Sequence, residues 1–413
     1  MAVPVEEYLA TLLAQVTPLP AEEVAVADAL GRGLAADLVA RLDVPPFDTS
    51  AMDGFAVRAA EAPAGTTLPV AGDIPAGPGR PGALPRRAAM RIMTGAPLPE
   101  GADAVVPVED TDQPAGPAAV PATVRIGVAS PAGANVRRRG EDVAAGAVVL
   151  PAGTRLTPAA LASAISVGHG VLTVRRRPRV AVVSTGSELV GPGEVPGPGQ
   201  IPDSNATLVA ALLRARGHDV AGVHRVADDV GALAAALEAA AADADLVITT
   251  GGVSAGAFDV VKEATTSRGF TYTAVAMQPG KPQGHGVVES TRGRSLVLAL
   301  PGNPVSVFVS FHLFARPVLD AMAGTPRRPG LLAARAAAGW TSPRGRRQYI
   351  PVRLTAPASL ADPLPTVVPT HPLGSGSHLI ASLHRANAIA VVPEDVLAVA
   401  AGDLVPVLLV EEP

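Results

Sequence analysis

A loop of small residues follows an apolar run in the stretch LVITTGGVSAGAFDVVK, Leu246–Lys262. Glycines let a backbone approach a ligand closely, and the N-terminus of a following helix carries partial positive charge. The loop therefore favours an oxyanion ligand, most simply a phosphate. It is not a Walker A loop. Gly251 and Gly256 have the right separation, but Ala257 and Phe258 stand where that motif needs Lys and Ser or Thr.

Four other apolar runs end in loops of similar character. The five loops are Thr185-Gly186-Ser187-Glu188, Asp228-Asp229, Gly251-Gly252-Val253-Ser254 with Asp259 and Lys262 behind it, Gln278-Pro279-Gly280-Lys281-Pro282, and Pro301-Gly302-Asn303-Pro304 with Ser306 behind it. If these loops gather at one edge of a sheet, that edge offers backbone N–H groups, helix N-termini, two lysines and at least three carboxylates.

Carboxylates repel a phosphate unless a cation lies between them. Mg²⁺ is a hard cation that takes oxygen ligands and keeps several waters, so it fits this need. Glu188, Asp228 and Asp259 are the candidate ligands. The chemistry indicated is phosphoryl or nucleotidyl transfer on a small molecule that carries a phosphate.

Each of these residues, taken singly, also has a purely structural explanation. Gly251-Gly252 could be a tight turn, Glu188 and Asp259 could be charges that favour a helix N-terminus, Lys262 could be a solvated surface residue, and Asn303-Pro304 could be an ordinary helix start. The functional interpretation depends on the convergence of all five loops.

The elements that would position the loops are regular between Arg179 and Ala323. Strands are predicted at 179–184, 219–226, 245–250, 270–277 and 295–300, and helices at 204–216, 229–242, 259–268 and 304–323, with Ser204 and Asn303 as caps. Alternating strands and helices of these lengths predict an α/β fold with a parallel sheet and helices on both faces. Ligands of such sheets bind beyond the carboxyl ends of the strands, where the five loops fall.

The rest of the chain has a different texture. Apolar residues at helical spacing predict an amphipathic helix from Val5 to Val16, and an Ala-rich stretch, helical or mixed, continues to about Ala40. Residues 41–140 alternate short Val and Ile runs with Pro and Gly, which predicts a β-rich region. Its one G-x-G-x-x-G match, Gly77–Gly82, follows no strand and is rejected as a dinucleotide motif. Residues 330–413 predict a small β domain.

Composition excludes several classes of protein. The 413 residues include no cysteine, which excludes disulfides, Cys-ligated zinc, iron–sulfur clusters and thiolate nucleophiles. A formal net charge of −4 gives no reason to expect nucleic acid or an anionic membrane as a partner. The acidic N-terminal stretch lacks the basic region of a signal peptide, and the longest uncharged run, Thr157–Val174, contains polar residues. We therefore expect a cytoplasmic protein.

Several long blocks of sequence resemble one family. PPFDTSAMDGFAVR, RIMTGAPLPEGADAVV, NVRRRGEDV, VSTGSEL, TTGGVSAGAFD, QPGKP, LPGNPVS and GSGSHLIASL stand in the order found in the molybdopterin molybdenumtransferase family. The resemblance covers essentially the whole chain. It implies an elongated, discontinuous α+β dimerisation domain (1–40 and 141–176), an inserted β-rich domain (41–140), an α/β molybdopterin-binding domain (177–325) and a C-terminal β-barrel (326–413). It also implies a homodimer whose active site lies between the α/β domain of one subunit and the inserted domain of the other.

The reaction implied by this resemblance is the last step of molybdenum cofactor synthesis. Adenylylated molybdopterin reacts with molybdate in the presence of Mg²⁺, AMP leaves and molybdenum enters the dithiolene. A protein without cysteine does not compete with the soft sulfur ligands of the substrate. Lys281 and Ser306 could hold the molybdate oxyanion. The implied partners are the molybdopterin adenylyltransferase and molybdoenzymes.

The resemblance also implies roles for single residues. Asp53, Thr94, Glu188, Asp228 and Asp259 match positions important for activity, and the last three are the expected metal ligands. Substrate contacts are expected from Thr185, Gly186, Ser187, Gly251, Gly252, Ser254, Lys262, Lys281, Pro301, Asn303, Pro304, Ser306 and Ser377. Two structural alternatives remain open. Asp53 could cap its own turn, and Arg137–Arg139 could be a solvated basic run.

Three residues depart from the pattern of the family. Gln278 stands where many relatives carry Lys, His285 where an aromatic residue is common, and Pro351 where Arg is expected. These departures bear on the molybdate pocket rather than on the cleavage site. Arg347 or Arg353 could compensate for the missing charge.

Two other functions compete with this one. The α/β region alone resembles the molybdopterin adenylyltransferase, which would consume ATP, but the inserted region with Asp53 and Thr94 argues against that activity. Eukaryotic relatives of this architecture act as scaffolds that cluster receptors, but no fused partner domain or long linker is visible here.

Overall fold

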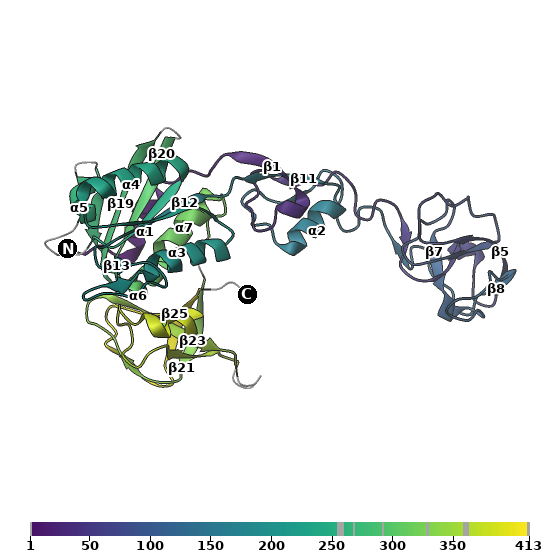
Figure 1. The fold of residues 1–413 in the computed structure, drawn as a ribbon. Helices are drawn as coiled ribbons and strands as arrows, with labels where there is room; N and C mark the ends of the chain where they lie inside the picture. The colour runs from purple at the N-terminus through teal and green to yellow at the C-terminus, as the bar shows by residue number, and fades with distance from the viewer. Residues whose placement is uncertain are drawn as a thin grey trace. The chain divides into compact units, whose positions relative to one another are not determined.

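The structure is a computed structural model that describes residues 2–253, 260–266, 269–290, 293–327, 330–357 and 363–410. The chain forms two compact units, whose elements are labelled in Figure 1. The first unit comprises residues 1–22, 31–33 and 175–413, and the second comprises residues 23–30 and 34–174. Two predicted site residues, Ser254 and Asp259, lie outside the described residues.

A six-stranded sheet with the order β15-β12-β16-β20-β19-β17 forms the centre of the first unit. Its strands are β12 (Arg179–Thr185), β15 (Asp219–Val226), β16 (Leu246–Thr250), β17 (Thr271–Ala274), β19 (Pro282–Ser290) and β20 (Gly293–Leu300). The first four in spatial order are parallel, and β19 runs antiparallel to both of its neighbours. The predicted α/β class with a parallel sheet is confirmed, and the carboxyl ends of the parallel strands share one edge.

Strand β19 was not predicted, because PQGHGVVES mixes Pro, Gly and polar residues. Its glycines make room for one ring of β17 and for the ring of the residue just before β17. A Cβ atom at Gly284 would lie 2.6 Å from Tyr272 Cε1, and one at Gly286 would lie 2.4 Å from Phe270 Cδ2. The predicted strand 270–277 is also divided, because β17 ends at Ala274 and a separate short strand, β18 (Met277–Gln278), leaves the sheet.

Helices cover both faces of the sheet, as Figure 1 shows. Alternate residues of β12 belong to different cores: Val180 and Val182 pack in the core that includes α3 (Ser204–Ala215), and Ala181 and Val183 pack in the core that includes α4 (Val230–Asp243). A seven-residue helix, α5 (Val260–Thr266), follows β16. The cap of α3 is Asp203 rather than the predicted Ser204, since an Asp203 carboxylate oxygen accepts a hydrogen bond from the Ala206 N–H at 3.1 Å.

The predicted helix 304–323 is a continuous but mixed helical segment. It consists of α6 (Pro304–Ser310), a π-helical turn (Phe311–Ala315) and α7 (Arg316–Met322), with Asn303 at the cap position but without a side-chain cap bond. Pro304–Met322 is long and apolar enough to cross a membrane, but 89% of the relevant window is buried inside the protein. Such burial is typical of a core helix.

The N-terminal helix α1 (Val5–Leu13) contributes Val5, Tyr8 and Leu12 to the same core as the sheet. Residues 1–22 therefore group with residues 175–413. The Ala-rich stretch that follows contains no α-helix. It forms the short strands β1 (Ala21–Ala25) and β2 (Leu38–Val39) with a 3-10 turn at Val26–Asp28. The four domain boundaries themselves stay predictions.

The second unit contains the β-rich region expected from the sequence. A five-stranded sheet has the order β7-β4-β6-β5-β8 and separates two small cores. Its strands are β4 (Gly54–Val57), β5 (Thr67–Ile74), β6 (Ala89–Ile92), β7 (Ala104–Pro107) and β8 (Thr123–Arg125). A further core is built around α2 (Pro158–Ser166) and the pair of β2 with β10 (Val148–Leu150).

The C-terminal region forms the predicted β-barrel. Its strands are β21 (Leu331–Ala336), β23 (Arg347–Thr355), β24 (Thr366–Pro369), β25 (Ala388–Val392) and β27 (Leu404–Leu409). The pairing β23-β24-β21-β27-β25 closes because β25 also pairs with β23. Strand β18 of the α/β region pairs with β23 outside this ring. The barrel is thereby attached to the loop that carries Lys281.

Candidate functional site

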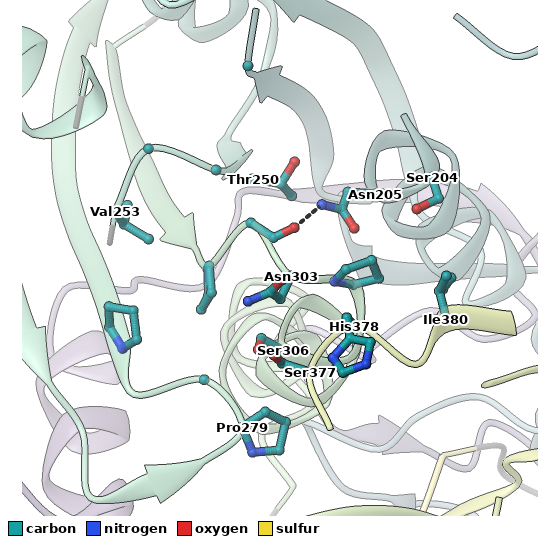
Figure 2. Close-up of a pocket in the computed structure, with 18 of the residues that line it drawn as sticks. Ser204, Asn205, Thr250, Val253, Pro279, Asn303, Ser306, Ser377, His378 and Ile380 are labelled. Atoms are coloured by element: carbon teal, nitrogen blue, oxygen red, sulfur yellow. Dashed lines mark hydrogen bonds between the residues drawn. The ribbon is translucent and has the colours of Figure 1, made fainter. Parts of the chain in front are cut away.

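A cavity of about 1000 Å³ lies beyond the carboxyl ends of β12, β15, β16 and β20. All five predicted loops contribute to its wall, together with residues of the barrel. The predicted site residues that line it are Thr185, Gly186, Glu188, Asp228, Gly251, Gly252, Lys281, Pro301, Asn303, Pro304, Ser306 and Ser377. Figure 2 shows Asn303, Ser306 and Ser377 gathered at this cavity. The convergence on which the functional interpretation depends is therefore present in the described part of the chain.

Hydrogen bonds from the loop after β12 fix the Asp228 carboxylate. Thr185 Oγ1 donates to one carboxylate oxygen at 3.0 Å, and the Ser187 N–H donates to the other at 3.0 Å. Ser187 Oγ in turn accepts from the Asp228 N–H at 3.0 Å. Ser187 does not line the cavity itself; its hydrogen bonds position Asp228. Each Asp228 oxygen keeps acceptor capacity beyond these bonds.

The carboxylate oxygens of Asp228 and of its neighbour Glu188 suit a hard divalent cation. Glu188 and Asp228 line the same cavity, and Mg²⁺ is commonly held by one or two carboxylates with waters and substrate phosphates. The Glu188 carboxylate folds back over Gly186, where a Cβ atom would lie 2.6 Å from Glu188 Oε2. Within the described ranges no three acidic or His side chains form a metal cluster. The third predicted ligand, Asp259, lies outside those ranges.

Glycines allow the loops of the site to pack backbone against backbone. At Gly251, which has a φ of 99°, a Cβ atom would lie 2.5 Å from the Thr185 carbonyl oxygen. At Gly302 it would lie 3.3 Å from Gly251 Cα. A Cβ at Gly252 would lie 2.4 Å from Val261 Cγ2. At Gly251, contact between the two backbones therefore requires glycine whatever the ligand.

The loop that carries Lys281 is held by hydrogen bonds from Gln283 and by the pairing of β18 with the barrel strand β23. Gln283 Nε2 donates to the Gly280 carbonyl oxygen and to Ser310 Oγ, both at 2.7 Å. Strand β18, just before the loop, pairs with Arg347 and Gln348 of the barrel. Lys281 thus lines the cavity at the junction of the two domains.

The predicted Lys262 is not among the residues that line the cavity. Its Nζ atom lies 5.8 Å from the ring centroid of Tyr272, at the distance of a cation–π contact.

The three departures from the family pattern have different consequences. Gln278 lines the cavity, so the missing lysine charge concerns the site directly. His285 packs edge-on to the Tyr8 ring at a centroid distance of 5.6 Å, and burial lowers its pKa. Pro351 is buried and pairs with Ile389 in the barrel wall. The last two therefore lie outside the cavity.

Neither Arg347 nor Arg353, the two candidates to replace the missing lysine charge, lines the cavity. Arg347 pairs with Glu6 and, at 3.3 Å, with Glu394. Among the described residues, Arg346 is the arginine that lines the cavity. Arg346 lies in a bend just before β23 (Arg347–Thr355), so strand periodicity could not indicate which of the two neighbouring arginines lines the cavity.

Sequence reasoning missed several other residues of the wall: Asp203, Asn205, Thr250, Arg346, Ser375 and His378. Asp203 accepts a 2.5 Å hydrogen bond from Ser184 Oγ and also caps α3. Its position directly before the N-terminus of α3 was the available signal. Nothing in the spacing of the barrel sequence indicated Ser375 or His378.

The second unit brings Asp53 and Thr94 together. One Asp53 oxygen accepts from the Thr94 N–H at 2.6 Å and from Thr94 Oγ1 at 2.7 Å, and these two bonds lower the pKa of Asp53. Asp53 also lines a cavity of about 380 Å³ within this unit. These bonds, rather than bonds to its own turn, hold its carboxylate. Of the basic run, Arg138 and Arg139 pair with Asp48 and Asp43.

Comparison with known proteins assigns the chain to a family. Three family models match it in order: the MoeA N-terminal region (domains I and II) at residues 3–168, the probable molybdopterin binding domain at 181–321, and the MoeA C-terminal region (domain IV) at 333–410. Molybdopterin molybdenumtransferase 2 of Mycobacterium tuberculosis is 45% identical over 92% of both chains. The chain belongs to the molybdopterin molybdenumtransferase family.

Other relatives agree with this assignment. The molybdopterin molybdenumtransferase of Haemophilus influenzae is 36% identical over 74% of both chains. A crystal structure of the molybdopterin biosynthesis MoeA protein from Pyrococcus horikoshii superposes with a TM-score of 0.81, at 27% identity, and covers 99% of this chain and 100% of its own. The Mycobacterium tuberculosis and Haemophilus influenzae relatives are both named molybdenumtransferases, which supports a transferase role in molybdenum cofactor biosynthesis. The predicted fold of alternating α/β, inserted β and barrel regions is confirmed.

Proposed function

We propose that this chain inserts molybdate into adenylylated molybdopterin, with Mg²⁺-dependent release of AMP, to give the molybdenum cofactor. The observation that carries the proposal is the convergence of Glu188, Asp228 and the glycine loops with Lys281 in one cavity. Membership of the family supports the choice of substrate. The oxygen and amide groups of the cavity match a phosphate-bearing substrate with a divalent cation.

The residues of the cavity divide into three tasks. The loops around Gly186 and Gly251 offer backbone N–H groups to the phosphates. Glu188 and Asp228 would hold Mg²⁺, together with Asp259 outside the described residues, and the bound ion would neutralise charge on the phosphates. Lys281, Ser306 and Ser377 offer a cation and hydroxyl donors to molybdate.

Replacing one oxo group of molybdate by the two sulfurs of a protonated dithiol releases one water, and both protons come from the thiols. Release of AMP is a hydrolysis: one water attacks the adenylyl–phosphate bond, and AMP and the terminal phosphate of molybdopterin are its two products. The protein therefore needs to supply binding and orientation rather than a redox partner. Since the chain has no cysteine, no protein thiolate competes for molybdenum.

The chain is proposed to act as a homodimer in which Asp53 and Thr94 of one subunit complete the site of the other. Exposed apolar side chains around the α2 core, among them Leu42, Ile165 and Val171, are the candidate dimer surface. The test uses mixed dimers of Asp53→Ala with Glu188→Gln subunits. Partial recovery of activity supports a shared site, whereas activity no higher than that of either parent contradicts it.

Further parts of the proposal follow from the family resemblance. We place the protein in the cytoplasm, with the molybdopterin adenylyltransferase as the source of its substrate and molybdoenzymes as acceptors of its product. Co-purification of tagged protein with either class tests these partners.

The decisive experiment incubates purified protein with adenylylated molybdopterin and Mg²⁺, with and without molybdate, and analyses nucleotides. Molybdate-dependent AMP release is expected. Consumption of ATP with free molybdopterin, and no AMP release with molybdate, would instead identify an adenylyltransferase. Binding without any turnover would point to a scaffold.

A further inference from the structure

Two side-chain oxygens in residues of the cavity wall have no hydrogen-bond partner among the described residues. They are Thr250 Oγ1, at the end of β16, and Asn205 Oδ1, in the first turn of α3, and both atoms are buried. Both residues line the cavity and are labelled among its side chains in Figure 2. Buried polar atoms in proteins are almost always paired. An unpaired one in the wall of a cavity therefore points to a ligand that supplies the partner.

A hydrogen bond from the Asn205 amide nitrogen fixes the orientation of the side-chain amide. Asn205 Nδ2 donates to the Gly302 carbonyl oxygen at 2.6 Å. A carbonyl can only accept, so the nitrogen must face Gly302 and Oδ1 must be left as an acceptor. Asn205 therefore links α3 to the Pro301–Pro304 loop through Nδ2, and its Oδ1 remains able to accept a hydrogen bond from a ligand.

The Thr250 hydroxyl lies on the side of the sheet where the cavity opens. Ile248, two residues earlier in β16, belongs to the core that contains residues of α3 and α6, and side chains two apart in a strand share a face. Thr250 is 1% exposed. Neither oxygen is itself exposed to solvent, so a bound donor must displace the atoms that cover it.

We propose that Asn205 and Thr250 are specificity residues that bind N–H donors on the heterocycle of the substrate. The inference rests on the proposed function and names groups of that same site. Two heterocycles of the proposed substrate carry such donors. The pterin has an amino group beside a ring N–H, and adenine has an amino group alone. The donor class is shared, so the test separates the two sources.

The chain offers a matched control next to Thr250. Thr249 Oγ1 is also buried without a partner in the described residues, and its side chain is 0% exposed, but Thr249 does not line the cavity. Thr249→Val and Thr250→Val remove the same group from opposite faces of one strand. Both variants are expected to melt at or above the temperature of the wild type, because each loses an unpaired buried hydroxyl.

Calorimetric titration with molybdopterin and with AMP, separately, gives the decisive measurement. Thr250→Val is expected to weaken one of these ligands about 10-fold, equivalent to about 1.4 kcal/mol, while Thr249→Val binds both as the wild type does. A loss confined to molybdopterin assigns the pterin, and a loss confined to AMP assigns adenine. Wild-type affinity of Thr250→Val for both ligands would overturn the role of Thr250.

A second pair of variants isolates the Asn205 acceptor. Asn205→Asp and Asn205→Leu both lose the bond to Gly302, but only Asp retains an acceptor. Asn205→Leu should therefore bind about 10-fold more weakly than Asn205→Asp, and equal affinities would contradict the proposal. If the wild type binds neither ligand, the proposed function fails and this inference fails with it. Normal binding and turnover in all variants would sink only the inference.

Discussion

The close approach of two loops at Gly251 makes a quantitative prediction about Gly251→Ala. The φ of 99° lies where side chains are strained, which costs about 1–3 kcal/mol. The new Cβ would also stand 2.5 Å from the Thr185 carbonyl oxygen, and relieving such an overlap costs about another 1–3 kcal/mol. We therefore expect a loss of about 2–6 kcal/mol in the free energy of unfolding.

Gly402→Ala is the matched control for this variant. Gly402 has nearly the same φ, 96°, but a Cβ atom there would meet nothing within 4 Å. It should lose only the strain, about 1–3 kcal/mol. Urea unfolding followed by circular dichroism compares the two variants. If Gly251→Ala proves no less stable than Gly402→Ala, the backbone contact between the loops after β12 and β16 is not tight in solution.

Gly251→Ala should also lower the rate of AMP release. Thr185 holds Asp228 through a 3.0 Å hydrogen bond, so displacing Thr185 displaces the carboxylate. A shift of about 1 Å in a catalytic group can lower activity about 100-fold. We expect a loss of that order in kcat/KM for AMP release by Gly251→Ala, and none by Gly402→Ala. Full activity in Gly251→Ala would refute the link from loop packing to the site.

Four other substitutions test separate parts of the site and core. Glu188→Gln and Asp228→Asn should abolish molybdate-dependent AMP release in nucleotide analysis while circular dichroism stays unchanged; normal turnover in both would defeat the metal assignment. Lys281→Met should raise KM for molybdate about 10-fold, by loss of one charge-assisted contact; an unchanged KM would place molybdate elsewhere. Burial, together with nearby arginines, lowers the pKa of His312 to about 3, so unfolded chains bind more protons than folded ones between about pH 6.5 and 3. The stability contributed by His312 is therefore present above about pH 6.5 and is lost as the pH falls toward 3. His312→Phe should flatten the free energy of unfolding as a function of pH in that range. An unchanged slope would contradict the burial of a neutral imidazole.

The sequence by itself determined the α/β elements and the loops of the site. Apolar runs such as Arg179–Thr185 and Leu246–Thr250 are long, uninterrupted and followed by Gly, so local pattern fixes both the strand and the loop after it. Because parallel strands place all their carboxyl ends at one edge, the convergence of Glu188, Asp228 and Lys281 followed without knowledge of the strand order.

The tertiary structure alone decided what depends on contacts between distant segments. In strand β19, Gly284 and Gly286 leave room for the rings of Tyr272 in β17 and of Phe270 just before it, which no local pattern reveals. Arg346 lines the cavity from the bend just before β23, whereas Arg347 pairs with the distant Glu6 and Glu394. That the oxygens of Asn205 and Thr250 have no partner among the described residues is visible only from the folded chain. Pattern along a chain reports periodicity and backbone preference, whereas hydrogen-bond satisfaction is a property of the folded whole.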